Sequence, residues 1–266
     1  MLYGAMNFPI RPVMSELETI VEMGFDYLEL TMDPPQAHHL LIRDLRDPLT
    51  ASLKQYQMGI VCHLPSFLFI ADLTKSIRDA SVKEMTDSLA VASELGATKV
   101  VVHPWYVSGL GTLVSDQAKQ YGLEGLAVIV AKAEELGLTL CLENLFPKAG
   151  SLSDPDDFEE VLDRFPTLKI TLDVGHAHIG RRRNYKSLEF IERFGRRIDH
   201  VHASDNFGKE DSHLPIGAGN IDFRKIFKAL RKTGYDQTVT LEVFSRDKGY
   251  LKDSRDKLSA LLARVS

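Results

Sequence analysis

The sequence has few cysteines, no long apolar run and no excess of basic residues, and each absence excludes a class of protein. Its two cysteines, Cys62 and Cys141, are far apart and form no CxxC pair, so we expect no disulfide framework and a reduced, cytoplasmic chain. No apolar stretch approaches the roughly 20 residues that cross a bilayer, and the first residues do not resemble a signal peptide, so we expect a soluble protein without a membrane partner. The formal net charge of −5 argues against a general nucleic-acid binder.

The sequence also lacks a linker. No low-complexity segment, composition shift or Pro/Gly/Ser-rich stretch divides it. With 44% hydrophobic and 26% charged residues over 266 positions, it has the composition of a globular chain with a sizeable core. We therefore expect a single domain over residues 1–266.

Short apolar runs alternate with amphipathic segments along the whole chain. In the helical segments, such as residues 81–96 and 124–137, apolar residues recur every three or four positions. Asp154 and Pro155 are typical of a helix start. Glycine follows several helical segments directly before a strand, at Gly24, Gly96, Gly137 and Gly234. The predicted strands are residues 2–8, 25–31, 59–65, 98–104, 138–144, 168–174, 198–204 and 238–244.

Strands that alternate with helices indicate a parallel sheet. Eight such units in roughly 250 residues fit a closed barrel better than an open sheet. The fold class predicted from the sequence is therefore α/β, a single (β/α)8 TIM barrel.

Polar residues gather where the predicted strands end, which is where the loops of such a barrel build an active site. From strand 2 onward, each strand ends in a carboxylate or an imidazole, and further such residues follow strands 6 and 7. His38 and His39 stand outside this series and are expected to be exposed. The residues of the series are Glu29, His63, His103, Glu143, Asp173, His176, His202, Asp211, His213 and Glu242.

Ionisable groups at a barrel mouth are costly unless opposite charge or a metal accompanies them. Excluding Glu29, the series holds five histidines and four carboxylates, with few Lys or Arg residues at the strand ends to neutralise them. Such ligands suit divalent Zn, Mn, Co or Mg. The sequence therefore predicts a site for one to three divalent metal ions.

Six segments carry a resemblance to a known family: "CHLP", "VVHPW", "CLENLF", "TLDVGHAH", "HVHASDN…DSHLPIGAGNIDF" and "TLEVF". Over essentially its full length the chain resembles the xylose isomerase-like TIM-barrel superfamily, which joins sugar and sugar-phosphate isomerases and epimerases to endonuclease IV. These motifs are more specific for the superfamily than for one reaction within it.

In the epimerase and isomerase branch, the resemblance implies one divalent metal held by Glu143, Asp173, His202 and Glu242. Glu143 and Glu242 would be the catalytic acid and base on opposite faces of a sugar carbon, working through an enediolate that the metal stabilises. His176 would bind a substrate hydroxyl. The small-molecule partner would be a sugar, a sugar phosphate or a related polyol.

In the endonuclease IV branch, the resemblance implies three zinc ions and a phosphodiesterase that acts on abasic DNA. His63, His103 and Glu143 would hold the first ion, and the four residues of the epimerase site would hold the second. His176, Asp211 and His213 would hold the third. The acidic net charge and a loop after strand 2 without Lys or Arg favour sugar chemistry, with nucleic acid as a partner only under this alternative. A related lyase or dehydratase, or a barrel that binds metal without turnover, also stays open.

Four further features have more than one interpretation each. The run Arg181, Arg182 and Arg183 could grip a phosphate or be a solvated basic loop. Trp105, the only tryptophan, could stack on a substrate or pack under a loop. Glu29 could bind substrate or belong to a hydrogen-bond network. The apolar segment 66–72 could wall the pocket, pack in the interior or bury a subunit contact in a homo-oligomer.

Overall fold

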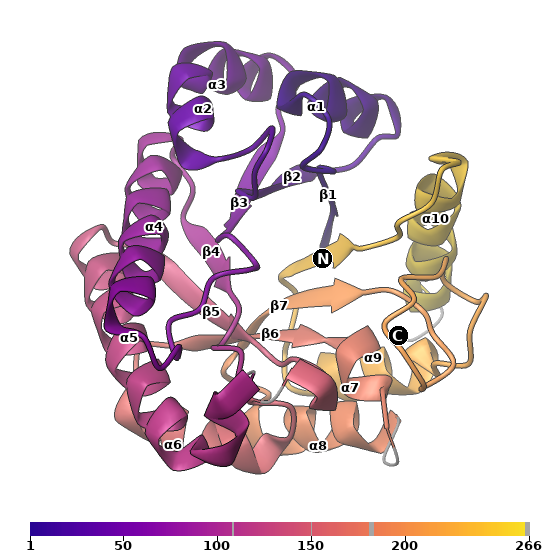
Figure 1. Cartoon of the computed structure of the whole chain (residues 1–266). Coiled ribbons are helices and arrows are strands. Elements are labelled where there is room, and N and C mark those ends of the chain that lie inside the picture. Colours follow the sequence, from indigo (N-terminus) through magenta and orange to yellow (C-terminus); the bar gives the residue numbers. More distant parts are fainter. Residues whose placement is uncertain (108, 150, 181–183, 264–266) are drawn as a thin grey trace.

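Eight parallel strands pair in chain order and close into a barrel, and pairing between β1 and β8 completes it (Figure 1). The computed structural model describes residues 1–107, 109–149, 151–180 and 184–263. The predicted TIM barrel is therefore confirmed. The strands are Leu2–Met6 (β1), Tyr27–Thr31 (β2), Gly59–His63 (β3), Lys99–Val102 (β4), Thr139–Glu143 (β5), Lys169–Asp173 (β6), Ile198–Ala203 (β7) and Thr238–Leu241 (β8).

Helices surround the strands on the outside of the barrel (Figure 1). None of the helices in the described ranges is both long and apolar enough to span a membrane. The α-helices are Val13–Glu22 (α1), His39–Asp44 (α2), Arg46–Gln55 (α3), Lys75–Glu94 (α4), Ser115–Glu135 (α5), Pro155–Arg164 (α6), Val174–His178 (α7), Asn184–Phe194 (α8), Phe223–Lys232 (α9) and Gly249–Ala263 (α10), and the short 3-10 helices are Gly109–Leu113 (η1) and Pro147–Ala149 (η2).

The predicted junctions between helices and strands have the expected local geometry. The four glycines before strands adopt φ angles from 69° at Gly137 to 85° at Gly234, in the left-handed region that favours glycine. Pro155 is the first residue of α6, and the Asp157 carboxylate accepts a hydrogen bond from the Asp154 amide at 2.9 Å. The four glycines return the chain to the barrel after α1, α4, α5 and α9.

Several predicted bounds differ from the observed ones. β2 begins at Tyr27 and not at residue 25; it ends at Thr31 as predicted, so Glu29 lies inside the strand and not at its end. β8 ends at Leu241, so Glu242 is the first residue of the following loop. The helices predicted from residues 81 and 124 begin earlier, at Lys75 and Ser115, because polar first turns precede their apolar pattern.

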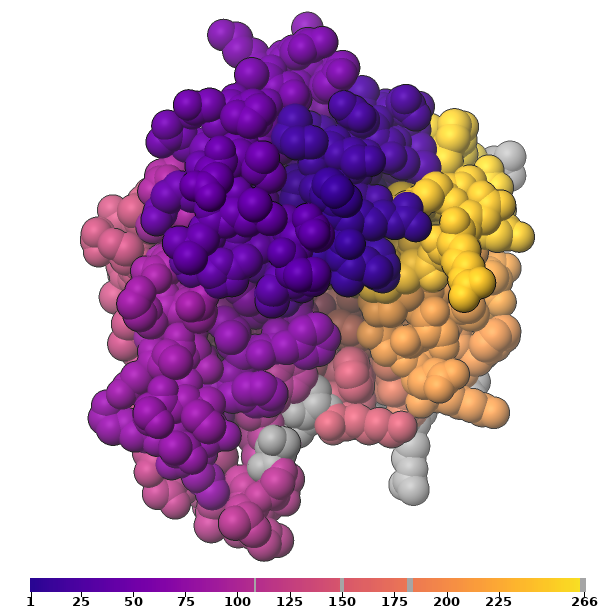
Figure 2. Space-filling model, turned by 45° about the horizontal axis from the view of Figure 1, so that its top comes forward, coloured from indigo at the N-terminus to yellow at the C-terminus, as the bar shows by residue number. Residues whose placement is uncertain are grey.

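Tyr27 fills the barrel interior at the end where the strands begin. A Cβ atom on Gly4 would lie only 2.1 Å from the Tyr27 ring, so a glycine on β1 is what admits this ring. The Tyr27 hydroxyl lies 2.7 Å from the Thr240 hydroxyl across the barrel. Glu29 follows two residues along β2, one layer higher, below the carboxyl ends of the strands. The first and last parts of the chain, indigo and yellow, adjoin on the face seen in Figure 2.

Candidate metal centre and active site

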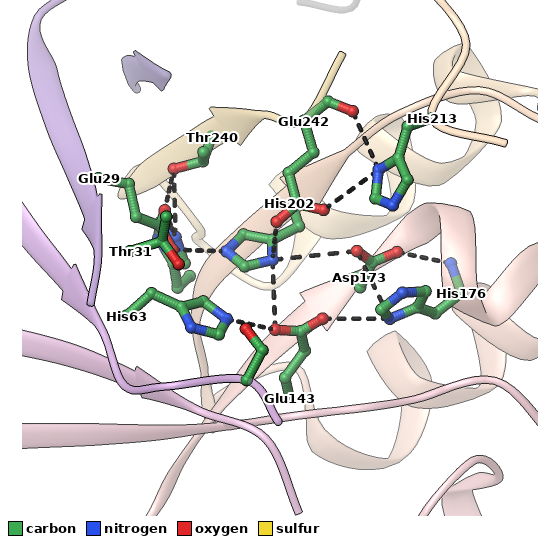
Figure 3. A network of polar contacts seen from close by, with 12 residues as sticks. Glu29, Thr31, His63, Glu143, Asp173, His176, His202, His213, Thr240 and Glu242 are labelled. Carbon is green, nitrogen blue, oxygen red and sulfur yellow. Dashed lines mark hydrogen bonds and ion pairs between the residues drawn. The ribbon is translucent and has the colours of Figure 1, made fainter. Parts of the chain in front are cut away.

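Three carboxylates converge on one histidine nitrogen at the carboxyl end of the barrel (Figure 3). His202 Nδ1 lies 3.0 Å from Glu242 Oε1, 3.3 Å from Glu143 Oε2 and 3.9 Å from Asp173 Oδ2. All four side chains are at most 6% exposed. Their strands β5 to β8 are consecutive, so closure of the barrel brings together residues that are far apart in the sequence.

Two atoms of this group have no hydrogen-bond partner, although they are buried. These atoms are His202 Nδ1 and Asp173 Oδ2. Unpaired buried polar atoms are costly, and both belong to one group of donors that lie within 4.8 Å of each other, together with an oxygen of Glu143. One imidazole and three carboxylates form a donor set suited to a divalent cation, so the residues present fit such an ion.

Glu29 supports His202 from below. Glu29 Oε1 lies 2.9 Å from His202 Nε2, and Oε2 lies 2.9 Å from His200 Nε2. A proton on His202 Nε2 is donated to this carboxylate, so Nδ1, once it has lost its own proton, directs its lone pair at the centre. Carboxylates behind metal-binding histidines fix the ring in this manner in many sites.

A second group extends the centre toward β3 and β4. His63 Nε2 and His103 Nε2 lie 3.4 and 3.3 Å from Glu143 Oε2. His63 Nδ1 donates to the Leu64 carbonyl at 2.7 Å, so the neutral ring presents a lone pair to the carboxylate. A proton or a cation between the two atoms would remove this repulsion.

A third group lies on the other side of Glu143. Asp211 Oδ2 is 3.1 Å from His176 Nε2 and 2.8 Å from His213 Nε2. His176 Nδ1 lies 3.1 Å from Glu143 Oε1, which links this group to the centre. His213 adopts φ 44°, an unfavourable backbone conformation for histidine that commonly occurs at functional sites.

In the metal-free site, the three carboxylates differ in the direction in which their pKa values are shifted. Burial is the main cause that raises the pKa of Asp173 to about 7, and Glu242 and Glu143 add to the rise while His176 opposes it. Burial also opposes ionisation of Glu143 and Glu242, but the neighbouring histidines, His202 foremost, together outweigh it and lower the pKa of both. The site therefore favours two ionised carboxylates and a third that readily holds a proton.

Residues from all three groups, though not Asp173 and His202, form the polar floor of a cavity of about 620 Å³. This volume suits a small organic ligand. No Lys or Arg lines the cavity in the part of the chain that the structure describes. The walls toward solvent are largely apolar and include Phe8, Ile10, Phe67, Phe146 and Phe244.

The structure brings nine of the predicted site residues together at one end of the barrel and places others elsewhere. Trp105 is 2% exposed and does not line the cavity, and a Cβ on Gly122 of α5 would lie 2.2 Å from its ring. Trp105, which lies in the loop after β4, therefore packs against α5 and does not form the substrate wall that was one of its two interpretations. Glu29 is fully buried beneath the floor, so it belongs to the hydrogen-bond network and not to the cavity wall. Arg181, Arg182 and Arg183 lie outside the described residues.

Several polar residues of the cavity were missed from the sequence, and Asp33 and Tyr106 are two of them. Asp33 follows β2, and its carboxylate accepts hydrogen bonds from Thr31 and Ser66 at 2.9 and 3.0 Å. Tyr106 lines the cavity and its hydroxyl lies 2.9 Å from His103 Nδ1. The predicted range of β2, residues 25–31, could have pointed to Asp33, because it is the first carboxylate beyond Thr31.

Known proteins share this architecture. A solved structure described as a D-tagatose 3-epimerase-like protein is 28% identical, superposes with a TM-score of 0.89 and covers 100% of this chain and 98% of its own. In curated sequences, the uncharacterized protein MJ1311 of Methanocaldococcus jannaschii is 32% identical over 251 residues, which cover 91% of this chain and 83% of that protein. A fructoselysine 3-epimerase of Escherichia coli O157:H7 is 21% identical over 97% of this chain and 96% of its own length.

The family model of the xylose isomerase-like TIM barrel matches residues 17–263. The match spans nearly the whole chain and agrees with the closed barrel of eight parallel strands. The chain therefore belongs to the xylose isomerase-like TIM barrel family.

Proposed function

We propose that the protein is a divalent-metal-dependent isomerase or epimerase of a sugar, sugar phosphate or related polyol. The observation that carries the proposal is the placement of Glu143 and Glu242. Their carboxylates reach His202 Nδ1 from β5 and from the end of β8, at 3.3 and 3.0 Å, and both line the cavity. Similarity to a D-tagatose 3-epimerase-like protein and to fructoselysine 3-epimerase supports this class of reaction.

Glu143, Asp173, His202 and Glu242 would hold the metal. When bound, the cation would stabilise the negative charge that develops on substrate oxygens in an enediolate. Glu143 and Glu242 would exchange a proton with a carbon next to the carbonyl, one removing it and the other returning it on the opposite face. His176, which lines the cavity beside Glu143, would orient a substrate hydroxyl.

The cavity supports a small substrate. The apolar walls exclude water from the reacting carbon, which strengthens the electrostatic contacts of the polar floor. With no cation on the cavity wall in the described ranges, the floor is suited to hydroxyl and carbonyl groups more than to a phosphate. A neutral sugar therefore agrees best with the described lining.

Glu143→Gln and Glu242→Gln test the acid and base roles. Each substitution keeps the side-chain size but removes the proton-accepting carboxylate, so we expect kcat to fall at least about 10²-fold. The measurement is exchange of substrate hydrogen in heavy water over a panel of ketoses and aldoses, with Glu18→Gln on the exposed face of α1 as the control. Full activity in either cavity variant, with the metal content unchanged, would exclude the assigned roles.

A zinc-dependent phosphodiesterase acting on abasic DNA is the second candidate. It is favoured by the additional groups of His63 and His103 with Glu143, and of Asp211 with two histidines. A probable endonuclease 4 of Mycoplasmoides gallisepticum is 24% identical over 79% of this chain and 75% of its own length. Zinc-dependent cleavage of an abasic oligonucleotide without sugar hydrogen exchange would select this function.

A further inference from the structure

Two helices on the outside of the barrel bring a second set of metal-binding side chains together. His38 and His39 stand at the start of α2, and Glu84 and Asp87 stand one turn apart on α4. The prediction that His39 is exposed is wrong, because only 4% of its surface is accessible. His38 keeps 32% of its side chain accessible, and Glu84 keeps 38%.

Both imidazoles lie close to one carboxylate oxygen. Glu84 Oε2 lies 3.1 Å from His38 Nε2 and 3.1 Å from His39 Nδ1. The three donor atoms lie within 4.8 Å of each other. Ligand atoms around a tetrahedral zinc, each about 2.0–2.2 Å from the metal, lie roughly 3.3–3.6 Å apart. The observed spacing is therefore close to that of a metal site, and small outward movements would admit the ion.

His39 provides an independent observation. Its Nδ1 is buried and makes no hydrogen bond, although Glu84 Oε2 is near, since the oxygen is not aligned with the ring nitrogen. Its Nε2 lies 3.9 Å from Asp87 Oδ2. A ring that bound a metal through Nδ1 would carry its proton on Nε2 and direct it toward this carboxylate, as ligating histidines usually do.

His38 must give up one long hydrogen bond before it can bind a metal. Its Nδ1 accepts a hydrogen bond from the Leu40 amide at 3.3 Å, which places the ring proton on Nε2. Coordination through Nε2 moves this proton to Nδ1 and gives up the long bond. Leu40 is 57% exposed, so water can reach this helix end and satisfy its amide. The exchange replaces a long hydrogen bond with a coordinate bond.

We propose that His38, His39 and Glu84 form a second site for a borderline transition metal such as Zn²⁺, which fastens α2 to α4. The exposed side of the site leaves room for a water molecule as the fourth ligand, and Asp87 serves as the outer partner of His39. Since α2 follows the segment that carries Asp33 and Pro34 into the wall of the main cavity, a metal at this site holds that segment in place.

The test is the number of zinc ions bound by the full chain, without a histidine tag. The chain is stripped with a chelator and titrated with Zn²⁺ alone, and the bound ions are counted at saturation. We expect Glu84→Gln and His38→Gln each to bind one zinc ion fewer than the wild type. Glu94→Gln is the matched control, because Glu94 is on the same helix, is similarly exposed at 35%, and pairs with Arg43 outside the site.

A double variant distinguishes zinc binding at this site from zinc binding at the main centre. Asp173→Asn changes the main centre, so the double variant Asp173→Asn/Glu84→Gln should bind one zinc ion fewer than Asp173→Asn alone. Circular dichroism establishes that each variant is folded. Equal zinc counts in the wild type, Glu84→Gln and His38→Gln would overturn the proposal. An equal loss in Glu94→Gln would overturn it as well, because it would indicate general attraction to surface carboxylates.

Discussion

Replacement of Glu29 by glutamine should weaken metal binding at the proposed centre from below without altering any residue of the cavity. Burial opposes ionisation of Glu29, but the neighbouring His202 and His200 outweigh it and hold its pKa well below the usual range. The carboxylate can accept both Nε2–H groups at 2.9 Å. A glutamine amide accepts only one, and its NH2 group then faces the other ring as donor against donor.

The magnitude follows from these contacts. An unsatisfied buried donor costs about 1–3 kcal/mol, and a lost hydrogen bond to a charged group about 1.5–3 kcal/mol. We expect a net loss of about 3 kcal/mol in the free energy of unfolding. With an unfolding entropy of ~2.1 cal/mol/K per residue over 266 residues, this corresponds to a fall in Tm of about 5 °C.

Metal affinity is the decisive assay for Glu29→Gln. Loss of the partner behind a ligating histidine typically weakens metal binding about 10–100-fold, because the ring and its tautomer are no longer fixed. Competition with a chromophoric chelator measures the dissociation constant, and circular dichroism confirms the fold. A folded variant whose metal affinity stays within about twofold of the wild type would refute the role of Glu29 in orienting His202.

Three further predictions concern packing, pH and metal binding. Gly122→Ala places a Cβ 2.2 Å from the Trp105 ring, so urea denaturation should give a loss of about 1–3 kcal/mol; unchanged stability would contradict the packing described for Trp105. Burial lowers the pKa of His213, but Asp211 and Glu242 outweigh it and raise the value from 6.5 to about 9. This raised pKa stabilises the metal-free fold fully below pH ~6.5, by about 3 kcal/mol, and the contribution disappears as the pH rises through about 9; His213→Gln should flatten the stability profile in this window. A divalent ion at 100 times its dissociation constant should stabilise the chain by about 2.7 kcal/mol, and a thermal scan with and without chelator measures the shift.

The fold could be predicted from the sequence because its signals are local. Periodicity of apolar residues distinguishes helix from strand within a few turns, and glycines such as Gly24 and Gly137 mark the returns to the barrel through their own backbone preference. In a closed parallel barrel all strands end on one face, so the residues at those ends are neighbours once the fold is known. For that reason nine candidate metal ligands could be named from the sequence alone.

Which residues belong to the site depends on contacts between distant parts of the chain. Glu29 looks like the last polar residue of its strand, but the register of β2 against β3, with Thr31 opposite His63, places it two residues below the strand end. Trp105 follows His103 as a cavity residue would, yet its ring packs against Gly122 of the next helix. Neither pairing leaves a signal within a short window of sequence.

The sequence alone determined the barrel, the order of its eight strands and the types of donor atom gathered near their carboxyl ends, because these follow from periodicity, turn chemistry and chain order. Only the tertiary structure decided which nitrogen of His202 faces the carboxylates, which side chains line the cavity, and that His38 and His39 meet Glu84 across two helices. The physical reason is that orientation and burial depend on contacts between residues far apart in the chain. A sequence pattern fixes the residue types that are available, whereas packing fixes the direction in which each of them points.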